Sequence, residues 1–146
     1  TFIRNIIKGL MEMNDRNIFY TDIKPDNIMV NQKTGEIRFI DFEDAIYSSC
    51  RNPESDELVG TIGYIGSEVL AMRPFYVKPS QVFSVGCIMY TLYERKIPFD
   101  DEIETTLCSL EYTSNEADVV VFMRMCLMAD PKKRIKLRDL LQSMEI

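Results

Sequence analysis

The polar stretch 20–27 and the later residue Asp41 carry the side chains that are best suited to chemistry. Asp22, Lys24 and Asn27 supply a carboxylate, an ammonium group and an amide, and Asp41 adds a carboxylate directly after a short apolar run. A carboxylate can orient an attacking hydroxyl group, and a lysine can neutralise an anionic group during its transfer. Carboxylate and amide oxygens are hard ligands that suit magnesium. Together these residues have the groups that phosphoryl transfer requires.

These polar residues also have a simpler interpretation. Asp22, Asp26 and Asn27 are common turn-forming residues, and taken alone this triplet favours an ordinary polar turn. By the same reasoning, Glu68 and Arg134 would be ordinary surface charges. The choice between chemistry and turn formation therefore depends on what surrounds these residues in the chain.

Two predicted elements frame the polar stretch. Before it, the spacing of apolar residues predicts a helix over 2–13 with one apolar face. That face carries Phe2, Ile6, Ile7, Leu10 and Met13. After it, the β-rich runs 28–30 and 37–40 are joined by a polar turn at 31–36 that contains a glycine, which predicts a hairpin.

The rest of the chain predicts one long loop followed by helices. Residues 41–68 show neither helical nor β periodicity, and a loop of this length in a compact domain is usually functional or disordered. Residues 80–93 are apolar on most faces, which predicts a buried central helix. Helical patterns follow over about 100–110, 116–128 and 136–145. We expect one domain, mostly α with a small β-hairpin.

Composition limits the partners and cofactors. The chain has 146 residues, 46% of them hydrophobic, which is enough for one sizeable core. Its 17 basic and 23 acidic residues give a net charge of −6, so we expect no nucleic acid or anionic membrane as a partner. There is no histidine, and the four cysteines form no C-x-x-C pair. We therefore expect reduced, mostly buried thiols and no structural zinc site.

The apolar runs and the N-terminus bear on location. No apolar run approaches the ~20 residues that span a bilayer, and the N-terminus lacks the pattern of a secretory signal. We therefore expect a cytoplasmic protein, with the nucleus as the alternative. Because Thr1 leads directly into the predicted helix, we also expect the chain to be a piece of a longer protein.

Five motifs, in the right order and spacing, resemble those of eukaryotic-type protein kinases. Residues 20–27 (YTDIKPDN) resemble the catalytic loop H-R-D-x-K-x-x-N, and residues 41–43 (DFE) resemble D-F-G. Residues 60–68 (GTIGYIGSE) are similar to the stretch that ends in A-P-E. Residues 80–86 (SQVFSVG) are similar to the start of the central helix, and residues 130–134 (DPKKR) to a late D-P-x-x-R motif. The resemblance covers the whole chain and implies the C-terminal lobe (C-lobe) of a kinase.

The resemblance implies a role for each candidate residue. Asp22 would be the catalytic base, Lys24 would contact the γ-phosphate of ATP, and Asn27 and Asp41 would hold Mg²⁺. A lysine two residues after the base is the serine/threonine-kinase form of this loop. Thr61 would lie in the substrate-facing part of the long loop and bond to the base and the lysine.

Two further features come from the same resemblance. Glu68 and Arg134 would form a buried ion pair that joins the long loop 41–68 to the last helices. Residues 96–103 (KIPFDDEI), together with the hairpin turn, look closest to the Pim-like and calmodulin-kinase-like branch.

The chain departs from the family pattern at positions that support or regulate the catalytic groups. Tyr20 and Thr21 replace histidine and arginine, so we expect no ordering of the long loop by an arginine-bound phosphate. Glu43 replaces a glycine that permits unusual backbone angles. Gly66-Ser67 replace alanine-proline, which would loosen a turn. Gln81 replaces an aspartate that holds the catalytic loop, and we expect its amide to accept one weaker hydrogen bond.

In a kinase, the N-terminal lobe (N-lobe) carries most of the groups that bind ATP. We expect that residues 1–146 do not include this lobe. No G-x-G-x-x-G motif occurs in the chain. Positioning of this kind is worth on the order of 7 to 11 kcal/mol of barrier lowering, so we expect no turnover by the chain alone. ATP and Mg²⁺ are expected to bind only with an N-lobe present.

Three functions remain open on these grounds. The first is the C-lobe of a serine/threonine protein kinase, with a protein substrate and an N-lobe as partners. The second is a non-catalytic kinase mimic or pseudokinase that binds another kinase through apolar surface around Phe39, Ile40 and Phe42. The third is a purely structural helical domain, for which Glu68→Ala would leave stability unchanged.

Overall fold

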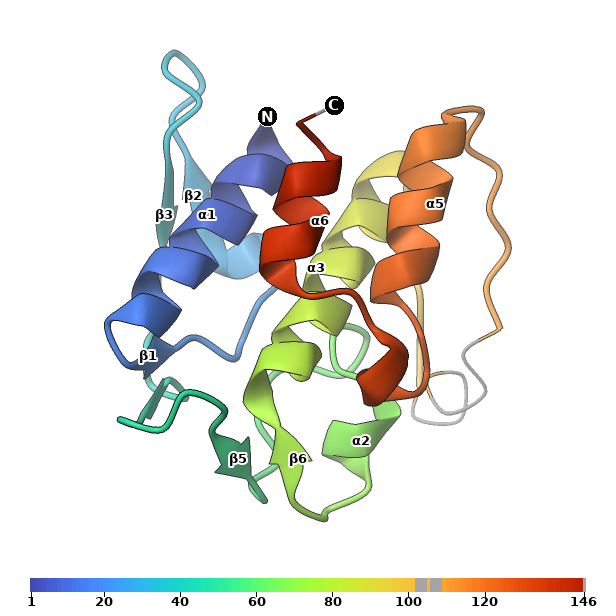
Figure 1. Cartoon of the computed structure of the whole chain (residues 1–146). Helices are drawn as coiled ribbons and strands as arrows, with labels where there is room; N and C mark the ends of the chain where they lie inside the picture. Colours follow the sequence, from blue (N-terminus) through green and yellow to red (C-terminus); the bar gives the residue numbers. More distant parts are fainter. Residues whose placement is uncertain (102–104, 106–108, 146) are drawn as a thin grey trace.

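The computed structural model describes residues 1–101, 105 and 109–145. Its four longest described helices lie roughly side by side, with both chain termini at the same end of the molecule (Figure 1). Their bounds are α1 Phe2–Asp15, α3 Val77–Glu94, α5 Ala117–Cys126 and α6 Leu137–Ser143. The predicted fold, mostly α with a small hairpin, is confirmed.

Short elements connect the four long helices. The shorter helical turns are η1 Pro25–Asn27, α2 Ser67–Leu70 and η2 Pro131–Lys133. The strands are β1 Ile18–Phe19, β2 Ile28–Val30, β3 Ile37–Phe39, β4 Ile46–Tyr47, β5 Glu54–Ser55 and β6 Phe75–Tyr76. They form antiparallel pairs, β1–β4, β2–β3 and β5–β6.

The predicted hairpin is β2–β3, with Ile28 opposite Phe39 and Val30 opposite Ile37. The segment 41–68, by contrast, is less irregular than its sequence suggests, because β4 and β5 lie within it and α2 begins at its end. Strands of two or three residues carry too little periodicity to be found from sequence. Their partners, β1 and β6, hold this segment to the body of the domain.

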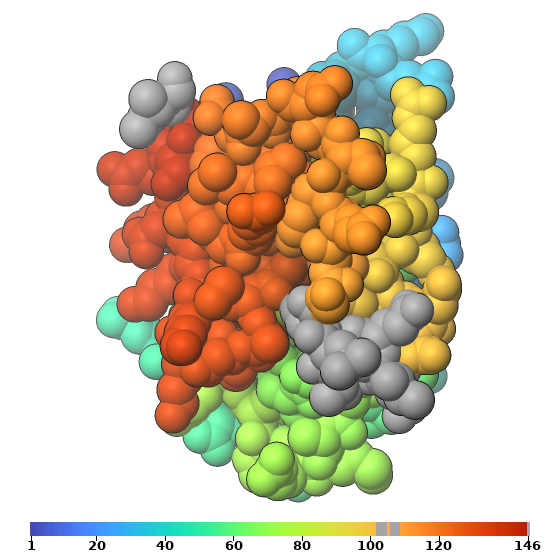
Figure 2. Space-filling model, turned by 90° about the vertical axis from the view of Figure 1, so that its right-hand side faces the viewer, coloured from blue at the N-terminus to red at the C-terminus, as the bar shows by residue number. Residues whose placement is uncertain are grey.

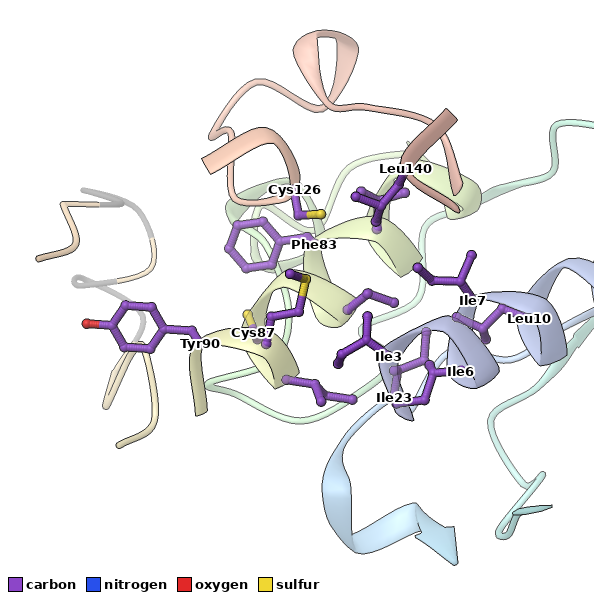
Figure 3. Packing of buried hydrophobic residues seen from close by; sticks show 14 of the residues in the cluster. Ile3, Ile6, Ile7, Leu10, Ile23, Phe83, Cys87, Tyr90, Cys126 and Leu140 are labelled. Atoms are coloured by element: carbon purple, nitrogen blue, oxygen red, sulfur yellow. The ribbon is translucent and has the colours of Figure 1, made fainter. Parts of the chain in front are cut away.

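Helix α3 is the centre of the core, as the apolar run predicted. Most of its residues are buried, and its first turn accommodates Pro79, because that position needs no intrahelical N–H bond. The buried cluster around it contains Ile6, Ile7 and Leu10 of α1, Cys126 of α5 and Leu140 of α6 (Figure 3). Apolar side chains removed from water in this way provide the main driving force for folding.

Helix α5 packs closely on α3. A side chain at Gly86 would bring a Cβ atom within 2.6 Å of Cys126 Cβ and 2.9 Å of Leu127, so only glycine fits this crossing. Figure 2 shows that α5 and the segment after it form much of the face that covers α3. The predicted helices 116–128 and 136–145 correspond to the shorter α5 and α6.

The described residues limit which of the helix and cysteine predictions can be compared with the structure. Most of the predicted helix 100–110 lies outside the described residues, as does Cys108. Of the other cysteines, Cys87 and Cys126 are buried and Cys50 is exposed, and none of these three is in a disulfide. None of the helices in the described part of the chain is long and apolar enough to cross a membrane.

Candidate active site

The loop between β1 and β2 holds the first candidate residues in a fixed arrangement. Its last turn is η1, which Pro25 begins. Asn27 Nδ2 donates hydrogen bonds to the backbone oxygen of Asp22 at 3.0 Å and to Asp22 Oδ2 at 2.9 Å. Because Asn27 binds both the backbone and the carboxylate of Asp22, the orientation of that carboxylate is set from within the loop.

Thr61 reaches the same carboxylate from the long segment 41–68. Its Oγ1 donates to Asp22 Oδ1 at 2.8 Å and accepts from Lys24 Nζ at 2.9 Å. Lys24 Nζ also lies 3.7 Å from Asp22 Oδ2. Gly60 and Gly63 have φ angles of +94° and +99°, a conformation that favours glycine and turns the chain so that Thr61 faces the loop.

Removing the Thr61 hydroxyl is expected to impair catalysis without unfolding the protein. In Thr61→Val, Asp22 and Lys24 both lose a partner, and we expect kcat to fall on the order of tenfold. Thr61→Ser retains the hydroxyl and serves as the control. The measurement is kcat for phosphate transfer by the gene product that contains residues 1–146. Equal kcat in Thr61→Val and the native protein would remove this bridge from the catalytic site.

Asp41 follows β3 and lies beside the loop. Ile40 N donates to the backbone oxygen of Asn27 at 3.0 Å, which extends the hairpin by one bond. This bond places Asp41 one residue away from a contact with Asn27, the other predicted Mg²⁺ ligand. Asp41 Oδ1 accepts from Glu43 N at 3.3 Å, and the remaining surface of Asp41 is exposed. Asn27 thus binds Asp22 through its side chain and Ile40, the residue before Asp41, through its backbone.

The backbone strain of this region is at Asp41. Asp41 has a φ of 60°, in the left-handed region, whereas Glu43 does not have a positive φ. A side chain at position 43 therefore meets no backbone restriction in this conformation. Left-handed angles in residues other than glycine are often found at functional sites, where the surroundings maintain them.

Tyr20 joins the loop to the residue before Asp41. Its hydroxyl donates to the backbone oxygen of Ile40, and its ring centroid lies 5.1 Å from those of Phe39 and Phe42. Burial raises the pKa of Tyr20 to about 12, and the Asp22 and Asp41 carboxylates add to this rise. Tyr20 therefore stays protonated and able to donate at neutral pH.

Thr21 stands where the family has a phosphate-binding arginine, and its short, neutral side chain binds the backbone instead. Its Oγ1 donates to the backbone oxygen of Asp44 at 2.8 Å. The same stretch of chain is held by β1–β4 pairing and by Ser48 N, which donates to Asn17 O at 3.1 Å. The start of segment 41–68 is therefore bound to the loop without any phosphate.

Glu68 and Arg134 form a two-point ion pair in the interior. Arg134 Nη2 donates to Glu68 Oε2 at 2.9 Å and Nη1 donates to Glu68 Oε1. Arg134 also donates to the backbone oxygens of Met128, Pro79 and Ala129. The pair joins α2 to the segment before α6, with the guanidinium centre 4.7 Å from the Phe83 ring.

Gly66 makes room for this ion pair. A Cβ atom there would overlap the Glu68 carboxylate and lie 3.0 Å from Arg134 Nη2. Its φ of −80° is open to any residue, so close packing explains this glycine. The expectation that Gly66-Ser67 loosens a turn stays a prediction.

Gln81 of α3 holds the loop with the opposite polarity to the one expected from sequence. Its Nε2 donates to the backbone oxygen of Tyr20 at 2.9 Å, so the amide acts on the loop as a donor. The expectation that it would accept a bond from the loop is therefore corrected. Because Gln81 is 1% exposed, this bond lies inside the core.

Comparison with known proteins identifies the family. The sequence model described as "Protein kinase domain" matches residues 1–144 of the chain. The chain belongs to the eukaryotic-type serine/threonine protein kinase family. The matched range includes the loop 20–27 and Asp41, whose catalytic and metal-binding roles stay predictions.

The kinase relatives are much longer than this chain. Mouse mitogen-activated protein kinase kinase kinase 15 is 26% identical over 97% of the chain and 11% of its own length. Yeast serine/threonine-protein kinase PSK1 is 30% identical over 77% of the chain and 8% of its own length. Human serine/threonine-protein kinase 40 is 26% identical over 96% of the chain and 34% of its own length. The chain spans about a tenth of the first two, and the Pim-like branch stays a prediction.

Asn14 is the functional candidate that sequence reasoning missed. It lies one helical turn after the buried Leu10, on the same side of α1, and its side chain binds Gln81. An amide at the i+4 position from a core residue is a signal that could have been read from the sequence.

Proposed function

We propose that this chain is the C-lobe of a serine/threonine protein kinase. Completed by a nucleotide-binding N-lobe, it transfers the γ-phosphate of ATP to serine or threonine of a protein, and alone it does not turn over. The observation that carries the proposal is the bonded set Asp22, Lys24 and Thr61 beside Asn27 and Asp41. A chance polar turn would not bring Thr61 onto a carboxylate and a lysine 37 to 39 residues away.

Each protein group has a task that its surroundings support. Asp22, oriented by Asn27 and Thr61, accepts a hydrogen bond from the substrate hydroxyl and receives its proton. Lys24, held beside it by Thr61, contacts the γ-phosphate and neutralises charge there. Since both side chains are largely buried, at 15% and 21% exposure, their electrostatic effect is weakly screened by water.

Asn27 and Asp41 fit a magnesium ion. The Asn27 nitrogen is bound to Asp22, so its amide oxygen is the atom that it can offer a cation, and Asp41 has an exposed carboxylate. Within the described residues, no group of three or more acidic or cysteine side chains could hold a metal. Mg²⁺ commonly takes one or two protein carboxylates plus substrate phosphates, and when bound it would neutralise the phosphates of ATP.

Apolar residues near the site support an N-lobe as partner. Met29, Ile40 and Phe42 are 59%, 41% and 40% exposed, at the edge of the hairpin and beside Asp41. Phe39 differs from its prediction as exposed surface: it is half-buried and packs over Gly9. Exposed apolar residues grouped in this way commonly mark an interaction site.

The test of this function is the magnesium dependence of phosphate transfer. In the gene product that contains residues 1–146, Asp41→Asn removes one ligand charge, and we expect the Mg²⁺ concentration for half-maximal rate to rise on the order of tenfold. Asp118→Asn, on the exposed surface of α5, makes the same charge change and should leave the dependence unaltered. An identical magnesium dependence in Asp41→Asn and the native protein would contradict the assigned role.

The exposed Ile40 and Phe42 also favour a second candidate, a non-catalytic kinase mimic. In that case the same surface would bind a whole kinase or an isolated N-lobe. A stable complex of that kind, together with no nucleotide or Mg²⁺ binding by the gene product, would favour the mimic.

A further inference from the structure

We infer that Asn14 and Gln81 are positioning residues for phosphate transfer, acting as a neutral amide pair that fixes the catalytic loop by donating to Tyr20 O. The inference rests on the proposed function and adds to it the device that holds the loop. Neither residue contacts the substrate-facing groups Asp22, Lys24 or Thr61 in the described hydrogen bonds, so both act through the loop backbone.

The two amides bind each other in both directions. Asn14 Nδ2 donates to Gln81 Oε1 at 2.9 Å, and Gln81 Nε2 donates to Asn14 Oδ1 at 3.1 Å. The second hydrogen of Gln81 Nε2 is then directed to Tyr20 O at 2.9 Å. An amide nitrogen has two hydrogens to donate, so these two bonds use its full capacity.

The reciprocal bonds decide the polarity of the contact with the loop. Because its oxygen is bound by Asn14, Gln81 presents its nitrogen to the loop, and the backbone oxygen of Tyr20 accepts the hydrogen bond. An acceptor-only carboxylate at position 81 would face two oxygens, Tyr20 O and Asn14 Oδ1. Asn14 and Gln81 are therefore matched to each other and to this loop conformation.

The contact is connected to both halves of the site. Tyr20 is 1% exposed, and while its backbone oxygen is held by Gln81, its hydroxyl donates to Ile40 O, directly before Asp41. Asp22 is two residues after Tyr20. A shift of Tyr20 would therefore displace the proposed base Asp22 and the proposed metal ligand Asp41 together. Small misplacements of catalytic groups have large effects on rate.

The test compares two substitutions that change polarity with little change in size, in the gene product that contains residues 1–146. Gln81→Glu removes both donated bonds, and we expect kcat to fall on the order of tenfold or more, with KM for ATP and for the protein substrate within about twofold. Asn14→Asp still accepts from Gln81 Nε2 and leaves the bond to Tyr20 O intact, so its kcat should fall less. Gln32→Glu, exposed in the hairpin turn, is the charge control and should resemble the native protein.

Backbone amide hydrogen exchange of residues 20–27 gives a readout that needs no catalysis. We expect faster exchange in Gln81→Glu than in Gln32→Glu, under conditions in which both are fully folded. If the native protein transfers no phosphate, the proposed function fails while this exchange still tests the positioning. If Gln81→Glu does not fold, Asn14→Asp gives the same comparison in milder form.

One pattern of results would overturn the inference. An acceptor role for Gln81 predicts that Gln81→Glu keeps or raises kcat and leaves exchange of the loop unchanged. The order native protein, Asn14→Asp, Gln81→Glu in falling kcat supports the donor role.

Discussion

Asp22→Asn is expected to reduce kcat for phosphate transfer by roughly 10² to 10⁴, the usual contribution of a positioned acid or base. Asparagine has nearly the same shape and can still accept from Thr61, but it cannot receive the proton of the substrate hydroxyl. Its side-chain nitrogen would also oppose Asn27 Nδ2, which now donates to Asp22 Oδ2. The measurement is the steady-state transfer rate of the gene product at saturating ATP and substrate.

The control for Asp22→Asn is Asp118→Asn, which removes one charge from an exposed position on α5. We expect Asp118→Asn to have native kcat, and urea unfolding to show that Asp22→Asn is folded under the assay conditions. A rate loss smaller than about tenfold in the folded Asp22→Asn protein is below the range for acid–base catalysis and would rule out the role of Asp22 as base.

Glu68→Ala is expected to lower the free energy of unfolding by about 3 to 5 kcal/mol, because it leaves the charge of Arg134 buried without its partner. The Arg134 side chain is 1% exposed, so water cannot replace the carboxylate. Its bonds to three backbone oxygens would remain, but they provide no compensating charge. Urea unfolding of the chain measures this loss.

Two comparisons make the Glu68→Ala result specific. Glu145→Ala breaks the exposed pair with Arg4, whose side chains are 38% and 47% accessible, and should cost no more than about 1 kcal/mol. The double replacement Glu68→Leu with Arg134→Met removes both charges and should be less destabilising than Glu68→Ala. A loss in Glu68→Ala no larger than that in Glu145→Ala would instead favour the purely structural domain considered from the sequence.

The elements with clear hydrophobic periodicity could be predicted from the sequence. The apolar face of α1, the all-round apolar run of α3 and the glycine-containing turn between β2 and β3 each have a physical signature in the order of residues. Strands β4 and β5 have two residues each, so they depend on partners far away in the chain and leave almost no pattern. Segment 41–68 consequently looked irregular throughout.

The candidate site was predictable in its residue types and less so in its contacts. Motif spacing pointed to Asp22, Lys24, Thr61 and Asp41, and the structure bonds the first three to one another and places Asp41 after Ile40, which binds the same loop. The direction of the Gln81 bond was not predictable, because an amide can donate or accept and only Asn14 decides which. The close packing of Gly66 against Glu68 was not predictable for a similar reason, since it is a tertiary contact.

Two departures from the family pattern place uncharged side chains where the family has charged ones, next to the loop 20–27. Thr21 binds Asp44 O where the family has an arginine, and Gln81 binds Tyr20 O where it has an aspartate. Both replacements use neutral donors directed at backbone oxygens. At these two contacts, the start of segment 41–68 and the loop 20–27 are thus held by bonds that need neither a phosphate nor a charged side chain.

The most direct test of the kinase proposal is transfer of labelled γ-phosphate from ATP. It should be measured in the gene product that contains residues 1–146 and in the isolated chain under the same conditions, with the labelled residue identified. We predict label on serine or threonine of a protein substrate with the gene product and none with the isolated chain. Absence of transfer by the folded gene product, or equal transfer by the isolated chain, would contradict the proposal.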